Sequence, residues 1–146
     1  MNRPQDKTGS CLCGAIQFKI MGTSSLVEYC HCDSCRKASG APVMAWAGTA
    51  IDDYAITQGE PECYASSPDV ERTFCKTCGT SLTQYSAEFP GEIYVSISIL
   101  DDPTQLSPNM HIWRSNRLSW FETSDNFPRY SGFKSGGVLE DLKVKK

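Results

Sequence analysis

Seven of the eight cysteines in this 146-residue chain lie in short clusters whose spacing suits metal ligands. The clusters are Cys11-x-Cys13, Cys30-x-Cys32-x-x-Cys35 and Cys75-x-x-Cys78. A tight turn can bring two such thiolates to the ~2.3 Å from one ion that a Zn–S bond requires. Disulfides are the alternative, but they need an oxidising compartment, and the first residues lack the apolar core and cleavage site of a secretory signal. The cysteines therefore predict metal sites in a cytoplasmic protein with reduced thiols.

The number of clustered cysteines favours one closed site and one open site. Cys13 and Cys78 are each followed by glycine, which tolerates the positive φ of a turn whose N–H groups point at sulfur. We therefore assign Cys11, Cys13, Cys75 and Cys78 to one structural zinc with four protein ligands. Cys30, Cys32 and Cys35 then hold a second zinc with one unfilled position, which is the ligand pattern of a catalytic zinc.

Two histidines and one further cysteine are candidates for roles near these sites. In an extended segment alternate side chains point to opposite sides, so Cys30 and Cys32 can converge on a metal while His31 faces away. We interpret His31 as a surface imidazole or one beside the site, with direct ligation as the alternative. His111 is expected to be a hydrogen-bonded structural histidine, with a lining or proton-transfer role near the open zinc as the alternative. Cys63 has no partner at ligand spacing and is expected to be a small buried hydrophobe.

Length and charge limit the classes of partner. The chain is long enough for one compact domain, and it has no apolar run near the twenty residues that a membrane helix needs. Its formal net charge is -3, and two Zn²⁺ ions on seven thiolates would lower this to about −6. The basic residues are scattered along the sequence. We therefore expect neither a nucleic-acid partner nor a membrane partner.

The apolar pattern predicts a mainly β fold with little helix. In the clearest strand, 92–100, isoleucine and valine alternate with polar residues, which is the pattern of a half-buried strand. Further strands are expected at 15–20, 26–29, 42–47, 54–57, 62–66, 70–74, 81–85 and 110–113. One helical turn is expected at 33–39, with Asp33 or Ser34 as its N-cap and Gly40 at its end.

Several segments together resemble the glutathione-dependent formaldehyde-activating enzymes, a family that also includes centromere protein V. The segments are 9–14 (GSCLCG), 30–40 (CHCDSCRKASG) and 72–80 (RTFCKTCGT), followed by His111, Trp120 and Pro128 in the family's order. The resemblance implies a β-tent fold, in which two antiparallel sheets splay around the metals, and the same division of cysteines between two zinc ions. It places one zinc-binding domain at 8–133 and leaves 134–146 as a C-terminal tail, which we expect to be flexible.

The resemblance also implies a reaction, the formation of a carbon–sulfur bond between glutathione and formaldehyde. A thiol that enters the open position of a three-cysteine zinc loses its proton. Such a zinc carries a charge of −1, so cations are needed to receive the carboxylates of glutathione. The first candidates are Arg36 and Lys37, which adjoin the cluster; Arg72, Arg114 and Arg117 are further ones. Four aromatic residues, Trp46, Trp113, Trp120 and Phe121, are expected in the core, with lining of a pocket as the alternative.

Two functions follow from the resemblance. The first is a zinc-dependent carbon–sulfur lyase that acts on glutathione or another thiol and on formaldehyde or a related small aldehyde. The alternative is a non-catalytic, zinc-stabilised protein-interaction module on the same fold, because fold and metal site do not fix the substrate.

Overall fold

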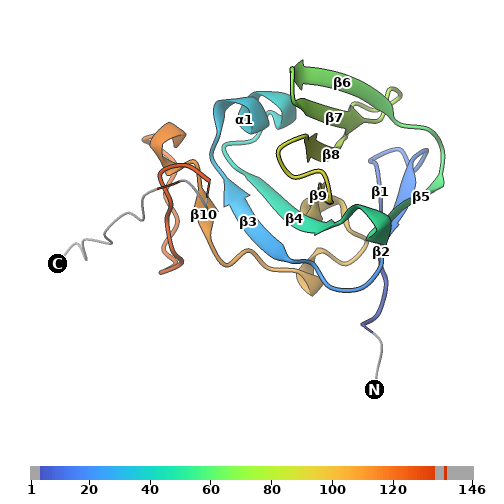
Figure 1. Ribbon diagram of the computed structural model, residues 1–146, viewed down its shortest axis with the longest axis horizontal. Coiled ribbons are helices and arrows are strands. Elements are labelled where there is room, and N and C mark those ends of the chain that lie inside the picture. The colour runs from blue at the N-terminus through green and yellow to red at the C-terminus, as the bar shows by residue number, and fades with distance from the viewer. Residues whose placement is uncertain (1–3, 134–136, 138–146) are drawn as a thin grey trace.

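The computed structural model describes residues 4–133 and 137, and strands make up most of its regular structure (Figure 1). In chain order the elements are β1 (Lys7–Ser10), β2 (Gln17–Ile20), β3 (Leu26–Cys30), α1 (Asp33–Ser39), β4 (Met44–Ala50), β5 (Tyr54–Gln58), β6 (Glu62–Ser67), β7 (Val70–Phe74), β8 (Ser81–Ser86), β9 (Glu92–Ser96) and β10 (His111–Ile112). The mainly β fold that the sequence predicts is confirmed. No helix among the described residues is long and apolar enough to cross a membrane.

The strands form a three-stranded sheet, in the order β1-β2-β5, and a seven-stranded sheet. The small sheet is antiparallel throughout. Phe18 and Ile20, two positions apart on β2, pack into one buried cluster with Ala47 of β4 and Val95 of β9. Because these alternate positions of β2 face the larger sheet, the two sheets share a core.

The larger sheet has the order β10-β3-β4-β9-β8-β7-β6, and it is antiparallel except for the parallel pair β10 and β3. The register places Glu28 beside Trp46. On the neighbouring strands Arg72 lies beside Gln84, which lies beside Tyr94. Paired residues project from the same face of a sheet, so side chains from five strands meet on one face together with Cys30, two positions after Glu28.

The short helix α1 follows β3 directly and lies beside β6 and β7 (Figure 1). Its N-cap is Cys32, whose Sγ accepts a hydrogen bond from the Cys35 backbone N–H at 3.2 Å, and not Asp33 or Ser34 as the sequence suggested. Gly40 ends the helix with a φ of 70°, as predicted. The helix therefore holds two of the candidate ligands, Cys32 at its N-cap and Cys35 in its first turn, and the third, Cys30, ends the strand before it.

One predicted strand is shorter than expected, and one strand was not predicted. The strand predicted at 92–100 ends at Ser96, and Ile97–Ile99 form a 3-10 turn in which the Leu100 N–H bonds to the Ile97 carbonyl. Ile97 is buried although it lies in the turn. The apolar alternation in the sequence therefore continues past the end of the strand, and the predicted strand was too long. Strand β1 was missed because Lys7–Ser10 has no apolar alternation; its pairing with β2 holds it in the sheet.

The tail predicted at 134–146 lies outside the described residues, except for Gly137. The domain boundaries at 8–133 and the β-tent arrangement therefore stay predictions.

Candidate metal centres and the adjoining cavity

The first cysteine cluster joins two loops that are distant in sequence. The sulfurs of Cys11, Cys13, Cys75 and Cys78 all lie within 4.8 Å of one another. The Sγ atoms of Cys11 and Cys13 are 3.6 Å apart, and those of Cys13 and Cys75 are 3.8 Å apart. Four sulfurs at ~2.3 Å from a tetrahedral ion would be separated by about 3.8 Å. The donor set therefore fits a four-coordinate metal ion such as zinc.

The turns around this cluster have the backbone geometry that the sequence predicted. Gly14 and Gly79 have φ values of 79° and 77°. The N–H of Gly14 bonds to the Cys11 carbonyl, and that of Gly79 to the Cys75 carbonyl. The Ile16 N–H donates to the Cys11 sulfur at 3.2 Å. A Cβ atom at either glycine would meet no atom within 4 Å. Glycine is therefore favoured here because of the positive φ, and not because a side chain would clash.

The second cluster lies where β3 passes into α1. The sulfurs of Cys30, Cys32 and Cys35 lie within 4.8 Å of one another, and those of Cys30 and Cys35 are 3.6 Å apart. Among the described residues, no histidine, cysteine or carboxylate donor joins them as a fourth member. The described residues thus offer three sulfur ligands to a metal ion at the second cluster, and a fourth ligand would have to be a water or substrate molecule.

In the second cluster, ionisation of one thiol disfavours ionisation of the others. Hydrogen bonds from Cys30 and Cys35 hold the pKa of Cys32 well below its usual range. Hydrogen bonding to Cys32 and Cys35, together with burial, raises the pKa of Cys30 well above its usual range. Buried thiols that share protons in this way would release them to a divalent cation, because coordination deprotonates a thiol.

Arg72 is the basic residue that contacts the second cluster. Its Nη1 and Nη2 atoms both lie 3.6 Å from Cys35 Sγ, and its Nε donates to Ser66 Oγ at 3.1 Å. The side chain is buried. On the neighbouring strand, Gln84 Oε1 lies 3.4 Å from the same sulfur. A guanidinium in this position stabilises negative charge on sulfur.

Arg36 and Lys37, the first candidates for receiving carboxylates, lie elsewhere. Arg36 forms an ion pair with Asp33 on the same helix, at 2.8 Å. Lys37 is exposed and lines, with Arg72, a cavity of about 470 Å³ between α1 and strands β6 and β7. Arg114 and Arg117 both pair with Glu122. Of these five basic residues, only Arg72 has a hydrogen bond to a cysteine sulfur among the described residues.

A cavity of about 570 Å³ adjoins the second cluster. The three cysteines form part of its wall, and Glu28 and Gln84 lie on the same sheet face. Aromatic residues supply much of the rest of the wall: Trp46, Phe89, Tyr94, Trp113 and Phe133. The cavity therefore combines sulfur donors with apolar walls, as small-molecule sites commonly do.

The aromatic residues that the sequence placed in the core differ in their positions. Trp46 is buried and also lines the cavity. Trp113 has a φ of 56°, a left-handed conformation that is uncommon outside glycine, and is 41% exposed. Trp120 is 71% exposed, so its expected core position is wrong. Phe121 lies against the His31 ring, with ring centroids 6.4 Å apart.

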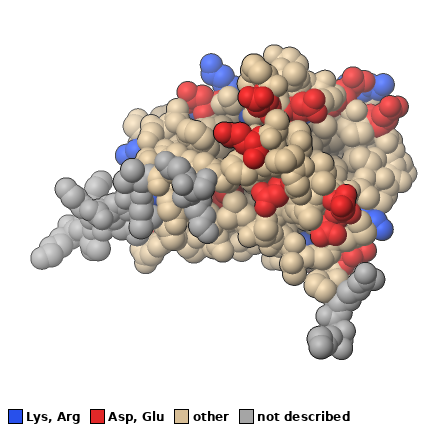
Figure 2. Space-filling view, in the orientation of Figure 1, with Lys and Arg blue, Asp and Glu red and all other residues tan. Residues whose placement is uncertain are grey.

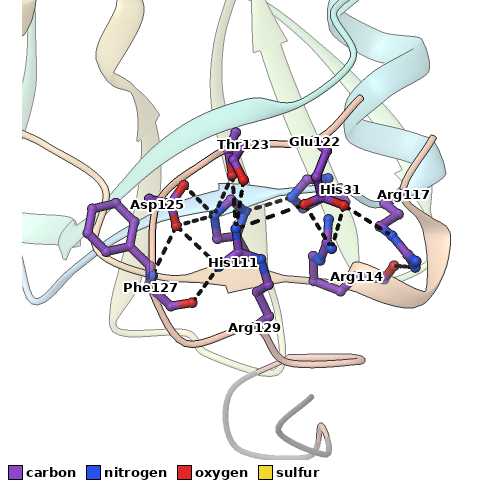
Figure 3. A network of polar contacts seen from close by, with 9 residues as sticks. All are labelled: His31, His111, Arg114, Arg117, Glu122, Thr123, Asp125, Phe127 and Arg129. Carbon is purple, nitrogen blue, oxygen red and sulfur yellow. Dashed lines mark hydrogen bonds and ion pairs between the residues drawn. The ribbon is translucent and has the colours of Figure 1, made fainter. Parts of the chain in front are cut away.

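His31 and His111 form the centre of a buried polar network (Figure 3). His31 Nε2 lies 2.8 Å from His111 Nδ1, and His111 Nε2 lies 3.1 Å from Asp125 Oδ1. Burial lowers the pKa of both imidazoles, that of His31 to about 4, although Asp125 opposes the shift at His111. With both rings neutral, His111 donates to Asp125 and accepts from His31. His31 Nδ1 is then an unprotonated, buried nitrogen that has no hydrogen-bond partner among the described residues.

This network corrects one expectation and confirms another. His31 is 1% exposed, so the surface position is wrong, whereas a buried position beside the candidate ligands agrees with the other interpretation. His111 is a hydrogen-bonded structural histidine, as predicted, because it ties β10 to β3 and to the segment that contains Asp125. Cys63 is exposed on β6, so its expected burial is wrong.

Comparison with known proteins places the chain in a family. Residues 6–116, which contain both cysteine clusters, match the family model of the glutathione-dependent formaldehyde-activating enzyme. The chain belongs to this family. It is similar to an uncharacterized lyase of Schizosaccharomyces pombe, with 39% identity over 74 residues. That match covers 51% of this chain and 53% of the relative, so it spans about half the length of the yeast protein.

Two further proteins match over a greater length. A Halomonas elongata protein, provisionally named a glutathione-dependent formaldehyde-activating enzyme, is 24% identical over 143 residues, which are 90% of this chain and 91% of the relative. The crystal structure of a Rhodobacter sphaeroides protein superposes with a TM-score of 0.56 at 25% identity. It covers 68% of this chain and 94% of the Rhodobacter chain. These matches support the fold and the family.

Proposed function

We propose that this protein is a zinc-dependent carbon–sulfur lyase that joins a thiol, such as glutathione, to formaldehyde or a related small aldehyde. The observation that carries the proposal is the three-cysteine cluster in the wall of the 570 Å³ cavity. In this proposal Cys11, Cys13, Cys75 and Cys78 hold a structural zinc. Cys30, Cys32 and Cys35 hold a catalytic one, and the protein acts in the cytoplasm.

The reaction places a small number of demands on the site. Zinc on the three cysteines would supply an acceptor position at which an incoming thiol becomes a thiolate. The thiol sulfur forms a bond to the carbonyl carbon, the carbon–oxygen π bond breaks, and the proton that the thiol lost ends on the former carbonyl oxygen. The sum is RSH plus CH₂O giving RSCH₂OH, with no change of oxidation state and no further co-reactant.

The residues of the chain provide charge balance and a shielded space. The guanidinium of Arg72 offsets the charge of the cysteine sulfurs through its contacts to Cys35. Trp46 and Tyr94, both buried, form an apolar wall beside the cluster. Removal of water from such a wall strengthens the electrostatic interactions inside it. The roles of Arg36 and Lys37 with glutathione carboxylates stay predictions, and neither residue lines this cavity.

The test is the entry of a thiol into the metal site. The protein is loaded with cobalt in place of zinc, the metal content is measured, and glutathione and other thiols are added. The thiolate-to-cobalt charge-transfer band should strengthen as a fourth sulfur binds, and a proton should be released. Cys35→Ser should lose this response, and Cys63→Ser, a matched change at an exposed cysteine outside both clusters, should keep it.

A cobalt spectrum that no thiol changes would contradict the proposal and favour the protein-interaction module. Binding is a better measure than weak turnover, because thiols and formaldehyde also combine without a catalyst.

A further inference from the structure

The cavity beside the three cysteines adjoins a second, shallower cavity. The second has a volume of about 500 Å³ and shares Glu88, Phe89, Tyr94 and Phe133 with the first. A substrate larger than formaldehyde whose sulfur reaches the cluster would therefore rest its remaining atoms against these shared walls.

The charged side chains that line both cavities are acidic. Glu28 is buried in the wall of the first cavity, Glu88 is exposed and lines both, and Glu92 lines the second. Among the described residues no lysine or arginine lines either cavity. A cavity lined by charges of one sign and by apolar walls concentrates ligands of the opposite charge and excludes those of the same charge.

Two basic residues near the second cluster, Arg72 and Lys37, do not line these cavities. The guanidinium of Arg72 contacts Cys35 and Ser66, and its charge offsets the −1 that a zinc ion on three thiolates would carry. Lys37 lines the separate cavity between α1 and strands β6 and β7. Among the described residues, Glu88 and Glu92 are therefore the charged side chains that a ligand meets on the shared wall and in the second cavity. On the face seen in Figure 2, separate groups of Asp and Glu atoms are spread over the upper half and the centre, while the visible Lys and Arg lie near the outline.

The aromatic walls favour the same sign of ligand. The rings of Phe89 and Phe133 lie 5.1 Å apart between centroids, in the part of the wall that the cavities share. Tyr94 is buried beside them, and its hydroxyl donates to Glu92 at 3.0 Å. The negative face of an aromatic ring attracts an ammonium group and repels a carboxylate.

On these grounds, and resting on the function proposed above, we infer that the cavity selects a thiol that carries a positive charge, or none, over a thiol that carries carboxylates. Glu88 and Glu92 are the residues that determine this preference. Glutathione, whose two carboxylates and one ammonium group give it a net negative charge, then fits the cavity less well than a small aminothiol does.

The experiment uses three thiols of similar size and different charge with the cobalt-loaded protein: cysteamine, 2-mercaptoethanol and mercaptoacetate. Dissociation constants are measured from the charge-transfer band. Because the three thiols differ in intrinsic acidity, the deciding quantity is the ratio of the mercaptoacetate constant to the cysteamine constant, compared between variants. Glu88→Gln and Glu92→Gln should each lower this ratio about two- to fivefold. Added salt should lower it in the wild-type protein, and Glu60→Gln, on an exposed loop away from both cavities, should leave it unchanged.

A second measurement needs no thiol binding and no metal at the second cluster. The protein is brought to one zinc ion per chain, its native circular dichroism is confirmed, and iodoacetamide and iodoacetate are used to alkylate Cys32. The two rates are followed by peptide mass spectrometry, and each is divided by the rate of the same reagent with free cysteine. The anionic reagent should be disfavoured several-fold, and the Glu88→Gln, Glu92→Gln double variant should reduce this discrimination.

The outcomes separate the two proposals. Thiol entry with the same ratio in the wild-type protein and the double variant would overturn the charge preference and leave the proposed function intact. If no thiol enters the cobalt site, the proposed function fails, and the alkylation rates alone decide whether the cavity discriminates by charge.

Discussion

Replacement of Arg72 tests how the second cysteine cluster tolerates its charge. Arg72→Gln removes the guanidinium and both contacts to Cys35 Sγ while it keeps a polar side chain on β7. Arg72 is only 7% exposed, so water cannot replace these contacts fully. A hydrogen bond to a charged group contributes about 1.5–3 kcal/mol. We therefore expect zinc to bind the second cluster about ten- to hundredfold more weakly in this variant.

The assay is competition for zinc with a chromophoric chelator, combined with the cobalt spectrum. Loss of N–H donors leaves more electron density on sulfur, so the charge-transfer band should move to lower energy. Arg72→Lys should give an intermediate zinc affinity, because lysine keeps the positive charge but cannot donate two hydrogen bonds from one planar group. Arg36→Gln is the matched control, since its guanidinium pairs with Asp33. An Arg72→Gln protein that is folded and has the wild-type zinc affinity and cobalt spectrum would refute the reasoning.

Three further predictions concern the cysteines and the buried imidazoles. Cys13→Ser or Cys78→Ser should unfold the domain or leave it insoluble, whereas Cys35→Ser should lose one zinc and stay folded; equal collapse in circular dichroism would contradict this difference. Cys63→Ala should leave the zinc content unchanged, because this exposed cysteine belongs to neither cluster. The pKa of His31 is lowered from 6.5 to about 4, so between these values the unfolded chain binds a proton that the folded chain does not. The free energy of unfolding, measured with denaturant at saturating zinc, should therefore fall as the pH drops from about 6.5 to 4, by up to about 3 kcal/mol from this residue; a slope that His31→Gln does not flatten would exclude this cause.

Local signals were sufficient for the turns and for the sets of cysteines that lie together. Gly14 and Gly79 have the positive φ that their place after a cysteine predicted, and the structure brings the sulfurs together in the sets that spacing and these glycines suggested. The roles of these sulfurs as ligands of two zinc ions stay predictions. The helix at 33–39 was also predicted, because Gly40 marks its end within a short segment. Each of these features depends on residues within a few positions of one another, or on a repeated local motif.

Burial was harder to predict than local conformation. The His31 side chain does not join the sulfurs of Cys30 and Cys32. It points instead toward β10, where His111 lies against it. The sequence around residue 31 contains no sign of this strand, which lies eighty positions later. Cys63 gave the opposite error. It lies on β6, one of the two edge strands of the larger sheet, whose described side chains are mostly exposed.

The charge around the second cluster depends on sheet order and not on sequence distance. Arg36 directly follows Cys35, yet a helical residue that follows a buried one points to another side, and its guanidinium pairs with Asp33. Arg72 is 37 positions from Cys35, yet it lies on the same sheet face as Gln84, and both residues reach the Cys35 sulfur. Glu88, in the turn between β8 and β9, lines both cavities, and Glu92, the first residue of β9, lines the second. The residues beside a zinc-binding motif therefore do not define the charge that a substrate would meet; the strands that cross the same face define it.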